Sequence, residues 1–346
     1  MRIPYWMRGA RVIGQRHLRL ALPWLSDAVS AVTSDGGVAP RMPAAEWLAT
    51  RGQRRASPVP AWRQWLLAGA GVEPRLLDRF PPGPCVYAAS NGVLPHGTWA
   101  CARPVHLLTA LDHLRMSPER LLLDPDETRA LAADLNRHLD GTGFRLHAAD
   151  SGEWLVECAD RVDCASVEPA QAAGRNLRDL MPAGPDGARV RSLMNELQML
   201  LHEHPVNERR AARALPAVNS LWLWGFGTAT LSAGLELPPL VTDDPWLAGL
   251  WSAHGTAPRR FEEFATASVE GPSMTLLGWA TPPPASGATQ CLAAAEATCF
   301  VSARAALRAG NVSHVEMLLG DRVIDTSRKA RLFIWRHERP LSEVLA

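Results

Sequence analysis

The sequence has almost no lysine: Lys329 is the only one among 36 Lys and Arg residues. A GC-rich coding bias explains this, and it also favours Ala, Pro, Gly and Trp; recognition of phosphate or carboxylate by planar, bidentate Arg is the second interpretation. No charge excess exists, because 36 basic residues face 35 acidic ones and the net charge is +1. Nucleic acid is therefore not expected as a partner.

Cysteine pairs and long apolar runs are also absent. None of the six cysteines forms a CxxC spacing, which argues against a disulfide framework and a zinc site. The apolar run at 20–25 is short and contains Pro23, so it does not predict a secretory signal, and no run approaches ~18 apolar residues. We expect a cytoplasmic protein of bacterial type, with no membrane contact, no metal and no cofactor.

The length of 346 residues suffices for one large domain or two ordinary ones. The breaker Pro81-Pro-Gly-Pro84 suggests a soft boundary near 81–97. We predict an N-terminal segment at 1–97, a main domain at 98–250, and a C-terminal segment at 251–346. The first holds a short strand within 17–24 and helices near 44–50 and 62–70. The last holds a helix at 292–309 and an antiparallel meander at 314–319, 322–325 and 331–335.

Two helices of the main domain are clearly marked. Asp124-Pro-Asp-Glu127 is a strong helix start, and Leu131, Leu135 and Leu139 then recur on one face. A second helix carries an apolar stripe from Val190 to Leu201. Beside that stripe run three polar residues, Asn195, Gln198 and His202. They form either a solvated flank or a polar rim that faces a pocket.

The stretch 216–224 predicts a strand that is apolar on both faces, hence central and covered on both sides. It ends at the glycine turn Gly225-Phe-Gly227, and sites in α/β layers tend to form at the carboxyl ends of central strands. Trp222 and Trp224 share one face of this strand, where they are either core residues or a platform for a ring-bearing ligand.

Four further polar residues surround this strand in sequence. His204 either bonds the carbonyls at a helix end or faces a cleft. Asn207 either caps a short helix or joins a ligand site, and Arg210 either packs or binds an anion beside the helix start. Asn219 lies in an apolar strand, so its amide needs partners, and we expect it to hold the preceding loop.

These residues belong to a run with a clear resemblance. His204-Pro-Val-Asn-Glu-Arg-Arg210 and Pro216-Ala-Val-Asn-Ser-Leu-Trp-Leu-Trp-Gly-Phe-Gly227 resemble the HPVN-x-x-R and PP-x-N-x-L-W-L-W-G-x-G segments of archaeal-type cofactor-independent phosphoglycerate mutases. They are also similar to a bacterial group of RpfE-type regulatory proteins, often labelled phosphoglycerate mutase in genomes. The bacterial group fits three further segments, namely 99–107, 195–202 and 243–250. Clear resemblance covers roughly 99–250.

The resemblance implies an α/β protein with a mixed sheet, similar to the domain inserted into the mutases. The mutases use two metals held by Asp and His and a Ser that accepts the phosphoryl group, but their Asp-Gly-x-Gly-Asp loop and later Asp/His clusters have no counterpart here. Asp243 and Asp244 are interpreted as the cap of a helix that begins at Pro245. Within the bacterial group's pattern, Cys101, Arg103 and Phe226 replace Arg, Asp and Gly.

We therefore expect a non-catalytic regulatory or interaction protein without the two-metal site. The alternative is a metabolite-binding protein or an enzyme that acts on a small phosphorylated acid. The partner is then a protein or a small phosphorylated metabolite. The candidate ligand pocket consists of Asn195, Gln198, His204, Asn207, Arg210, Asn219, Trp224 and Gly225.

Overall fold

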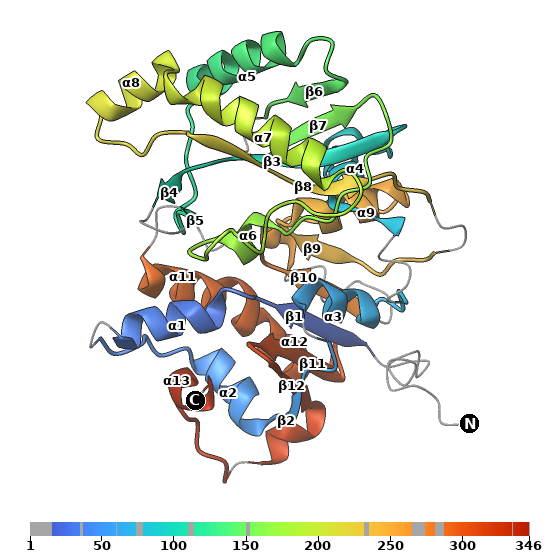
Figure 1. Ribbon diagram of the computed structural model, residues 1–346. Helices are drawn as coiled ribbons and strands as arrows, with labels where there is room; N and C mark the ends of the chain where they lie inside the picture. Colours follow the sequence, from blue (N-terminus) through green and yellow to red (C-terminus); the bar gives the residue numbers. More distant parts are fainter. Residues whose placement is uncertain are drawn as a thin grey trace. The chain divides into compact units, whose positions relative to one another are not determined.

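The protein consists of two compact units (Figure 1). The computed structural model describes residues 16–34, 37–59, 61–73, 79–109, 114–149, 153–231, 235–264, 274–280, 287–333 and 335–345. The terminal unit combines residues 1–77 with 232–346, and the middle unit spans 78–231. The segments expected from the sequence, 1–97, 98–250 and 251–346, are consecutive stretches, whereas the terminal unit joins both ends of the chain.

The terminal unit is built on a mixed six-stranded sheet with the order β2-β12-β11-β1-β10-β9. Its strands are β1 (His17–Ala21), β2 (Gln53–Ala56), β9 (Leu240–Thr242), β10 (Met274–Gly278), β11 (His314–Leu319) and β12 (Arg322–Ser327). β1 pairs in parallel with β10 and β11, and β10 pairs in parallel with β9. β12 is antiparallel to both β11 and β2.

Helices cover both faces of this sheet. Its α-helices are α1 (Leu25–Ser34), α2 (Pro43–Arg51), α3 (Trp62–Gly69), α9 (Pro245–Ala253), α11 (Ala288–Ala295), α12 (Val301–Ala309) and α13 (Leu341–Leu345). Leu18 and Leu20 of β1 face the core formed with α1, α2, α11, α12 and α13. The opposite face meets α3, where the Arg19 guanidinium donates to the Trp65 carbonyl at 3.0 Å.

A π-helical turn, η4 (Glu296–Phe300), joins α11 to α12. Its first residue, Glu296, accepts hydrogen bonds from the backbone N–H groups of Ala44 (2.6 Å) and Ala45 (3.1 Å) in the first turn of α2. A carboxylate in this position satisfies N–H groups that have no partner inside the helix.

The meander predicted for the C-terminal segment is confirmed for its first two strands, β11 and β12. The third strand, predicted at 331–335, is wrong, because the chain forms the 3₁₀ helix η5 (Arg328–Leu332) instead. β2 already occupies the free edge of β12, so no backbone edge remains there for the chain that follows.

The middle unit has a four-stranded antiparallel sheet with the order β6-β7-β3-β8 and a separate pair, β4-β5. The strands are β3 (Thr98–Val105), β4 (Leu107–Thr109), β5 (Leu114–Met116), β6 (Phe144–His147), β7 (Trp154–Cys158) and β8 (Ser220–Gly227). The helices are α4 (Pro82–Asn91), α5 (Pro125–Leu139), α6 (Pro169–Ala172), α7 (Gly187–His202) and α8 (Pro205–Ala212). The expected mixed α/β architecture is confirmed for the chain.

Both marked helices form as predicted. Asp124 is the N-cap of α5 in a complete capping box with Glu127, and Leu131, Leu135 and Leu139 are buried. The apolar stripe of α7 is buried and packs against β8. The prediction that the strand after α8 is central is wrong, because β8 lies at the edge of the sheet. Its residues are nevertheless buried on both faces, since α7 and α4 both pack against it.

No helix in the described part of the chain is long and apolar enough to cross a membrane.

Candidate functional site

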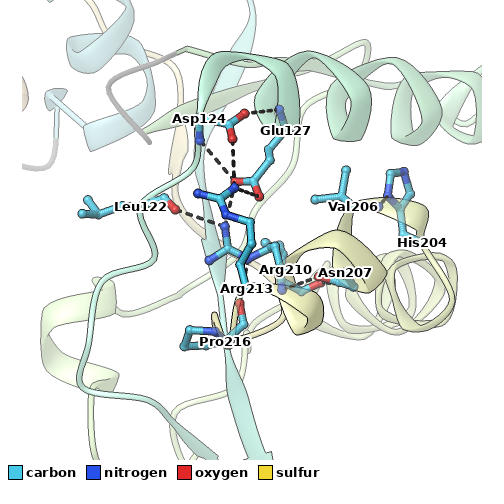
Figure 2. Close-up of polar contacts among 10 residues, drawn as sticks. Leu122, Asp124, Glu127, His204, Val206, Asn207, Arg210, Arg213 and Pro216 are labelled. Atoms are coloured by element: carbon cyan, nitrogen blue, oxygen red, sulfur yellow. Dashed lines mark hydrogen bonds and ion pairs between the residues drawn. The ribbon is translucent and has the colours of Figure 1, made fainter.

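The junction between α7 and α8 is shaped by Pro205. Proline disfavours helical backbone in the residue before it, and His204 is extended, with φ −71° and ψ 133°. His204 is therefore the N-cap of α8, not the end of α7. Its Nδ1 accepts from the N–H of Val206 at 3.2 Å, and both residues are labelled in Figure 2. Its Nε2 lies 3.1 Å from Asp134 Oδ2 on α5. This buried ring thus joins two helices, and the prediction that Asn207 caps α8 is wrong.

Asn207 instead connects the end of α7 to the chain that enters β8. Its Nδ2 donates to the carbonyls of Leu201 (2.7 Å) and Val218 (2.9 Å), and its Oδ1 accepts from the Val218 N–H at 2.8 Å. One side-chain amide therefore replaces the backbone pairing that neither segment can make with the other.

Asn219, which follows Val218 in the chain, also connects two segments through its side-chain amide. Its Oδ1 accepts from the Leu107 N–H at 2.7 Å, and its Nδ2 donates to the Leu107 carbonyl at 2.8 Å. The amide thus holds the chain at the first residue of β4. The expectation that it holds the loop before its own strand missed this more distant partner.

Arg210 is enclosed at the centre of this region (Figure 2). Its Nη1 donates to Glu127 Oε2 at 2.7 Å and to the Leu122 carbonyl at 3.1 Å, and its Nε donates to the Pro216 carbonyl at 2.7 Å. Both side chains of the ion pair are almost fully buried, at 2% and 5% exposed. Glu127 therefore serves twice, as the capping-box acid of α5 and as the partner of Arg210.

We call His204, Asn207, Arg210 and Asn219 the motif clamp. The structure brings these four candidate residues together around the start of β8. Trp224 and Gly225 lie toward the other end of that strand. Asn195 and Gln198 lie on α7, the first exposed and the second half-buried. The eight predicted residues thus occupy separate places in the middle unit.

Trp224 belongs to a buried polar group on one face of the sheet. Its Nε1 donates to Glu153 Oε1 at 3.2 Å, and Arg103 donates to the other oxygen of the same carboxylate, with Nε at 3.0 Å. Sequence reasoning singled out Arg103 as a departure from the family pattern but missed its partner Glu153, which precedes β7. Burial raises the pKa of the neighbouring Cys101 thiol well above its ordinary value, and the Glu153 charge acts in the same direction.

The glycine turn at the end of β8 is filled by the proline-rich stretch. Gly225 has φ +67°, and a Cβ there would lie 2.6 Å from Pro82 Cβ; at Gly227 a Cβ would lie 2.5 Å from Pro81 Cγ. The Gly225 N–H also donates to Ser166 Oγ at 3.1 Å. The glycines therefore permit a close approach to the start of α4 rather than leaving space for a ligand at these atoms.

The terminal unit holds the acids that follow β9. Asp244 is the N-cap of α9, as predicted, and accepts from the Leu247 N–H at 2.8 Å. It also pairs with Arg63 at 2.6 Å, while Asp243 accepts from the Ala280 N–H. Within the residues that the structure describes, no three His, Cys, Asp or Glu side chains gather as metal ligands.

A basic cavity of about 780 Å³ lies in the same unit. Arg16, His314, Arg328 and Lys329 line it together with uncharged polar residues. A smaller cavity of about 360 Å³ is lined by Arg54, Trp335, Arg336 and their neighbours. Neither cavity was predicted from the sequence. The chain's only lysine was the available signal for the first, because it stands in the basic stretch that begins at Arg328.

Comparison with known proteins connects the chain to one enzyme family over part of its length. It is 27% identical over 159 residues to a 2,3-bisphosphoglycerate-independent phosphoglycerate mutase of Methanothrix thermoacetophila, covering 46% of this chain and 39% of the relative. The mutase of Methanosarcina mazei is 23% identical over 181 residues, 46% of each protein. A probable mutase of Geobacter sulfurreducens is 36% identical over 70 residues, covering 20% of this chain and 18% of the relative.

The chain thus spans less than half the length of each of these relatives in the matched regions. Part of it is homologous to the cofactor-independent phosphoglycerate mutases. No family model matches the chain.

Comparison with solved structures supports the fold through one match. The PH0037 protein of Pyrococcus horikoshii matches with a TM-score of 0.50 and 13% identity, covering 90% of this chain and 87% of that one. A cofactor-independent phosphoglycerate mutase from Thermoplasma acidophilum matches with a TM-score of 0.46 and 16% identity, covering 95% and 94%.

Proposed function

We propose that this protein is a non-catalytic regulatory or interaction protein of the RpfE type, derived from the phosphoglycerate mutase scaffold and acting in the cytoplasm. The observation that carries the proposal is the use of the motif clamp. The polar groups of Asn207, Arg210 and Asn219 bond to backbone groups and to Glu127 within the middle unit. In this chain, the residues that resemble the mutase motif therefore make contacts that support the fold.

The residues at the carboxyl ends of the parallel strands do not fit the two metals that the mutase family implies. Trp24 follows β1, and Trp279 follows β10 and packs against it with ring centroids 5.5 Å apart. After β9, Asp244 is buried and neutralised by Arg63. A pair of divalent cations needs several free carboxylate or imidazole ligands, and a guanidinium beside the buried acid opposes a cation.

The second candidate function is the binding of a small phosphorylated acid, and the basic cavity of the terminal unit favours it. Such an acid is the kind of compound on which the homologous mutases are named to act. The eight residues predicted as a ligand pocket remain a proposal for the middle unit. The two candidates are compatible, because a regulatory protein can report on a metabolite without converting it.

The experiment is a thermal unfolding series on the full chain with Mn²⁺, with 3-phosphoglycerate and with both, alongside an assay for conversion of 3- to 2-phosphoglycerate. We expect no conversion and no rise in Tm that depends on the metal, since ligands that bind only the native state raise its stability. Stabilisation by 3-phosphoglycerate alone supports the metabolite-binding form of the proposal. Metal-dependent turnover, lost on treatment with a chelator, would refute the non-catalytic proposal.

Interaction with a protein is tested separately by affinity purification of the full chain from its own cells. The test variant carries Asn195→Asp and Met199→Glu, which add negative charge to the exposed face of α7 and leave its buried stripe unchanged; the wild-type chain is the control. A partner that binds both forms uses another surface, and a partner that binds only the wild type identifies α7 as the contact.

A further inference from the structure

Two basic side chains of the terminal unit, Arg328 and Lys329, form no ion pair among the described residues. Arg19, Arg41, Arg51 and Arg63 each lie within 3.2 Å of a carboxylate oxygen of the same unit. By contrast, no carboxylate among the described residues lies within ion-pair distance of the side chains of Arg328 or Lys329. Both are exposed, and both line the basic cavity.

The cavity is assembled from segments far apart in the sequence. Arg16 precedes β1, Gln53 begins β2, His314 begins β11, and Arg328 and Lys329 follow β12. All of them meet at one end of the sheet, where β1 and β11 begin. The lining contains no Asp or Glu. Because like charges repel, Arg328 and Lys329, which have no carboxylate of the described residues at ion-pair distance, create a positive potential that an anion relieves.

Local details keep this end of the sheet open and positive. Gly310 ends α12 with φ +86°, and a Cβ there would lie 2.4 Å from Arg328 Nη2, so any side chain would displace the guanidinium. His314 Nδ1 donates to Asp325 Oδ1 at 2.8 Å, and this hydrogen bond raises the pKa of the histidine.

We infer that this cavity is a binding site for a small, multiply charged anion that carries a phosphate group. Its volume is in the range of sites for small ligands. Arg offers a planar pair of donors, and Lys offers a point charge, a combination suited to phosphate oxygens. The side chains of Gln53, Asn311 and Ser327 supply uncharged hydrogen-bonding groups around it. The inference rests on the second candidate function in naming a phosphorylated acid as the ligand class.

The position of this site differs from that of the mutase-like motif. The motif clamp belongs to the middle unit, and the acids after β9 follow the opposite ends of the parallel strands. The cavity instead lies where those strands begin, and none of its lining residues belongs to the mutase-like motif. A phosphorylated acid bound there is held by the chain's own cations and needs no metal.

The test is isothermal titration calorimetry of the full chain with inorganic phosphate and with 3-phosphoglycerate, at low and high salt. The variants Arg328→Gln and Lys329→Gln each remove one lining charge. Arg331→Gln is the matched control, because Arg331 is exposed in the same 3₁₀ helix but does not line the cavity. An unchanged Tm confirms that each variant folds.

We expect wild type and Arg331→Gln to bind alike, and each cavity variant to bind at least about tenfold more weakly, as the loss of a charge-assisted hydrogen bond predicts. Equal weakening in all three variants would show diffuse charge and overturn the site. So would unaltered binding in the cavity variants, or no binding of either anion to wild type. Tighter binding of a single-stranded oligonucleotide that displaces phosphate would reassign the surface to a polyanion.

The two proposals fail in different ways. If phosphate binds in the cavity but 3-phosphoglycerate does not, the anion site stands and that metabolite is rejected as its ligand. If 3-phosphoglycerate binds wild type and both cavity variants equally, the metabolite-binding function stands and the location inferred here is wrong.

Discussion

The two units use their arginines differently. In the middle unit Arg210 and Arg103 reach buried carboxylates, and Arg210 also donates to carbonyls from two segments of the chain. In the terminal unit several arginines are paired as well, but Arg328 and Lys329 face a cavity that contains no acid. The residues that resemble the mutase motif therefore lie where polar groups support the backbone, whereas Arg328 and Lys329, which line the basic cavity, lie outside that motif.

The strongest way to test the supporting role is to remove Arg210. Arg210→Ala leaves the buried Glu127 carboxylate without its cation. It also removes the hydrogen bonds that Arg210 donates to the carbonyls of Leu122 and Pro216. We expect a loss of about 3–5 kcal/mol in the free energy of unfolding, measured by urea denaturation.

Arg213→Ala is the matched control, because Arg213 is 59% exposed and lies 3.4 Å from Asp124. The Arg213→Ala substitution should lower the free energy of unfolding by less than about 1 kcal/mol. Similar values for the two variants would contradict the view that Arg210 is a structural residue.

Asn207→Ala should have the next largest effect. It removes the partner of two carbonyls and one N–H at the joint between α7 and β8. Unsatisfied buried groups of this kind predict a loss of about 2–3 kcal/mol, again from chemical denaturation. Asn195→Ala, an exposed position on α7, should change stability by less than about 0.5 kcal/mol. A small effect at Asn207 with normal folding would free it for a role in ligand binding.

The glycine turn can be tested with a pair of alanine substitutions. Gly225 and Gly97 have similar positive φ angles, +67° and +78°, but only Gly225 lies against another residue, Pro82. Both substitutions should lower the free energy of unfolding by about 1–2 kcal/mol, because alanine disfavours the left-handed backbone. Gly225→Ala should lose about 1–3 kcal/mol more, because its new methyl group overlaps the proline. If the two variants lose equal stability in thermal or urea unfolding, the backbone at Gly225 can move away from Pro82, and the close contact has no energetic effect.

The smallest expected effect concerns pH in the terminal unit. The hydrogen bond to Asp325 raises the pKa of His314 above 6.5, whereas burial and the neighbouring His314 lower that of His17, whose ring stacks on His314 at 4.9 Å. The raised pKa stabilises the fold below pH 6.5, and this contribution is lost as pH rises through the folded-state value. The lowered pKa of His17 acts in the opposite sense and reduces stability as pH falls below 6.5.

Asp325→Asn should therefore destabilise the protein more below pH 6.5, where His314 is charged, than at a pH above the folded-state pKa of His314. NMR titration of the histidine ring protons checks the two directions, and unfolding curves across this range check the consequence. Glu316 and Arg55 also act on His314 and stay in place in the variant. A stability difference that grows with pH would show that Asp325 acts in another way.

The sequence predicts best what depends on near neighbours. The capping box at Asp124 and Glu127 and the leucine stripe of α5 follow from spacings of three and four residues, and both are confirmed. The interpretation of Asp244 as a helix cap succeeds for the same reason. In each case the deciding contacts lie within one or two turns of helix.

The failures concern partners that are distant along the chain. The edge position of β8 depends on how β3 and β7 pair, and the missing third strand after β12 depends on β2, whose residues lie more than 200 positions earlier. Arg103 was recognised as unusual, but its partner Glu153 carries no mark in the sequence. The basic cavity draws on four separate segments of the chain, so no spacing could predict it.

The interrupted terminal unit has a consequence for how the protein is made. β1 lies between β10 and β11, so neither neighbour exists until more than 250 further residues have been translated. At about 5–20 residues per second, the nascent strand waits for tens of seconds with apolar Leu18 and Leu20 uncovered. The middle unit, whose strands all lie within 78–231, emerges complete during this interval. Chain order alone therefore delays completion of the terminal sheet until after the middle unit has emerged.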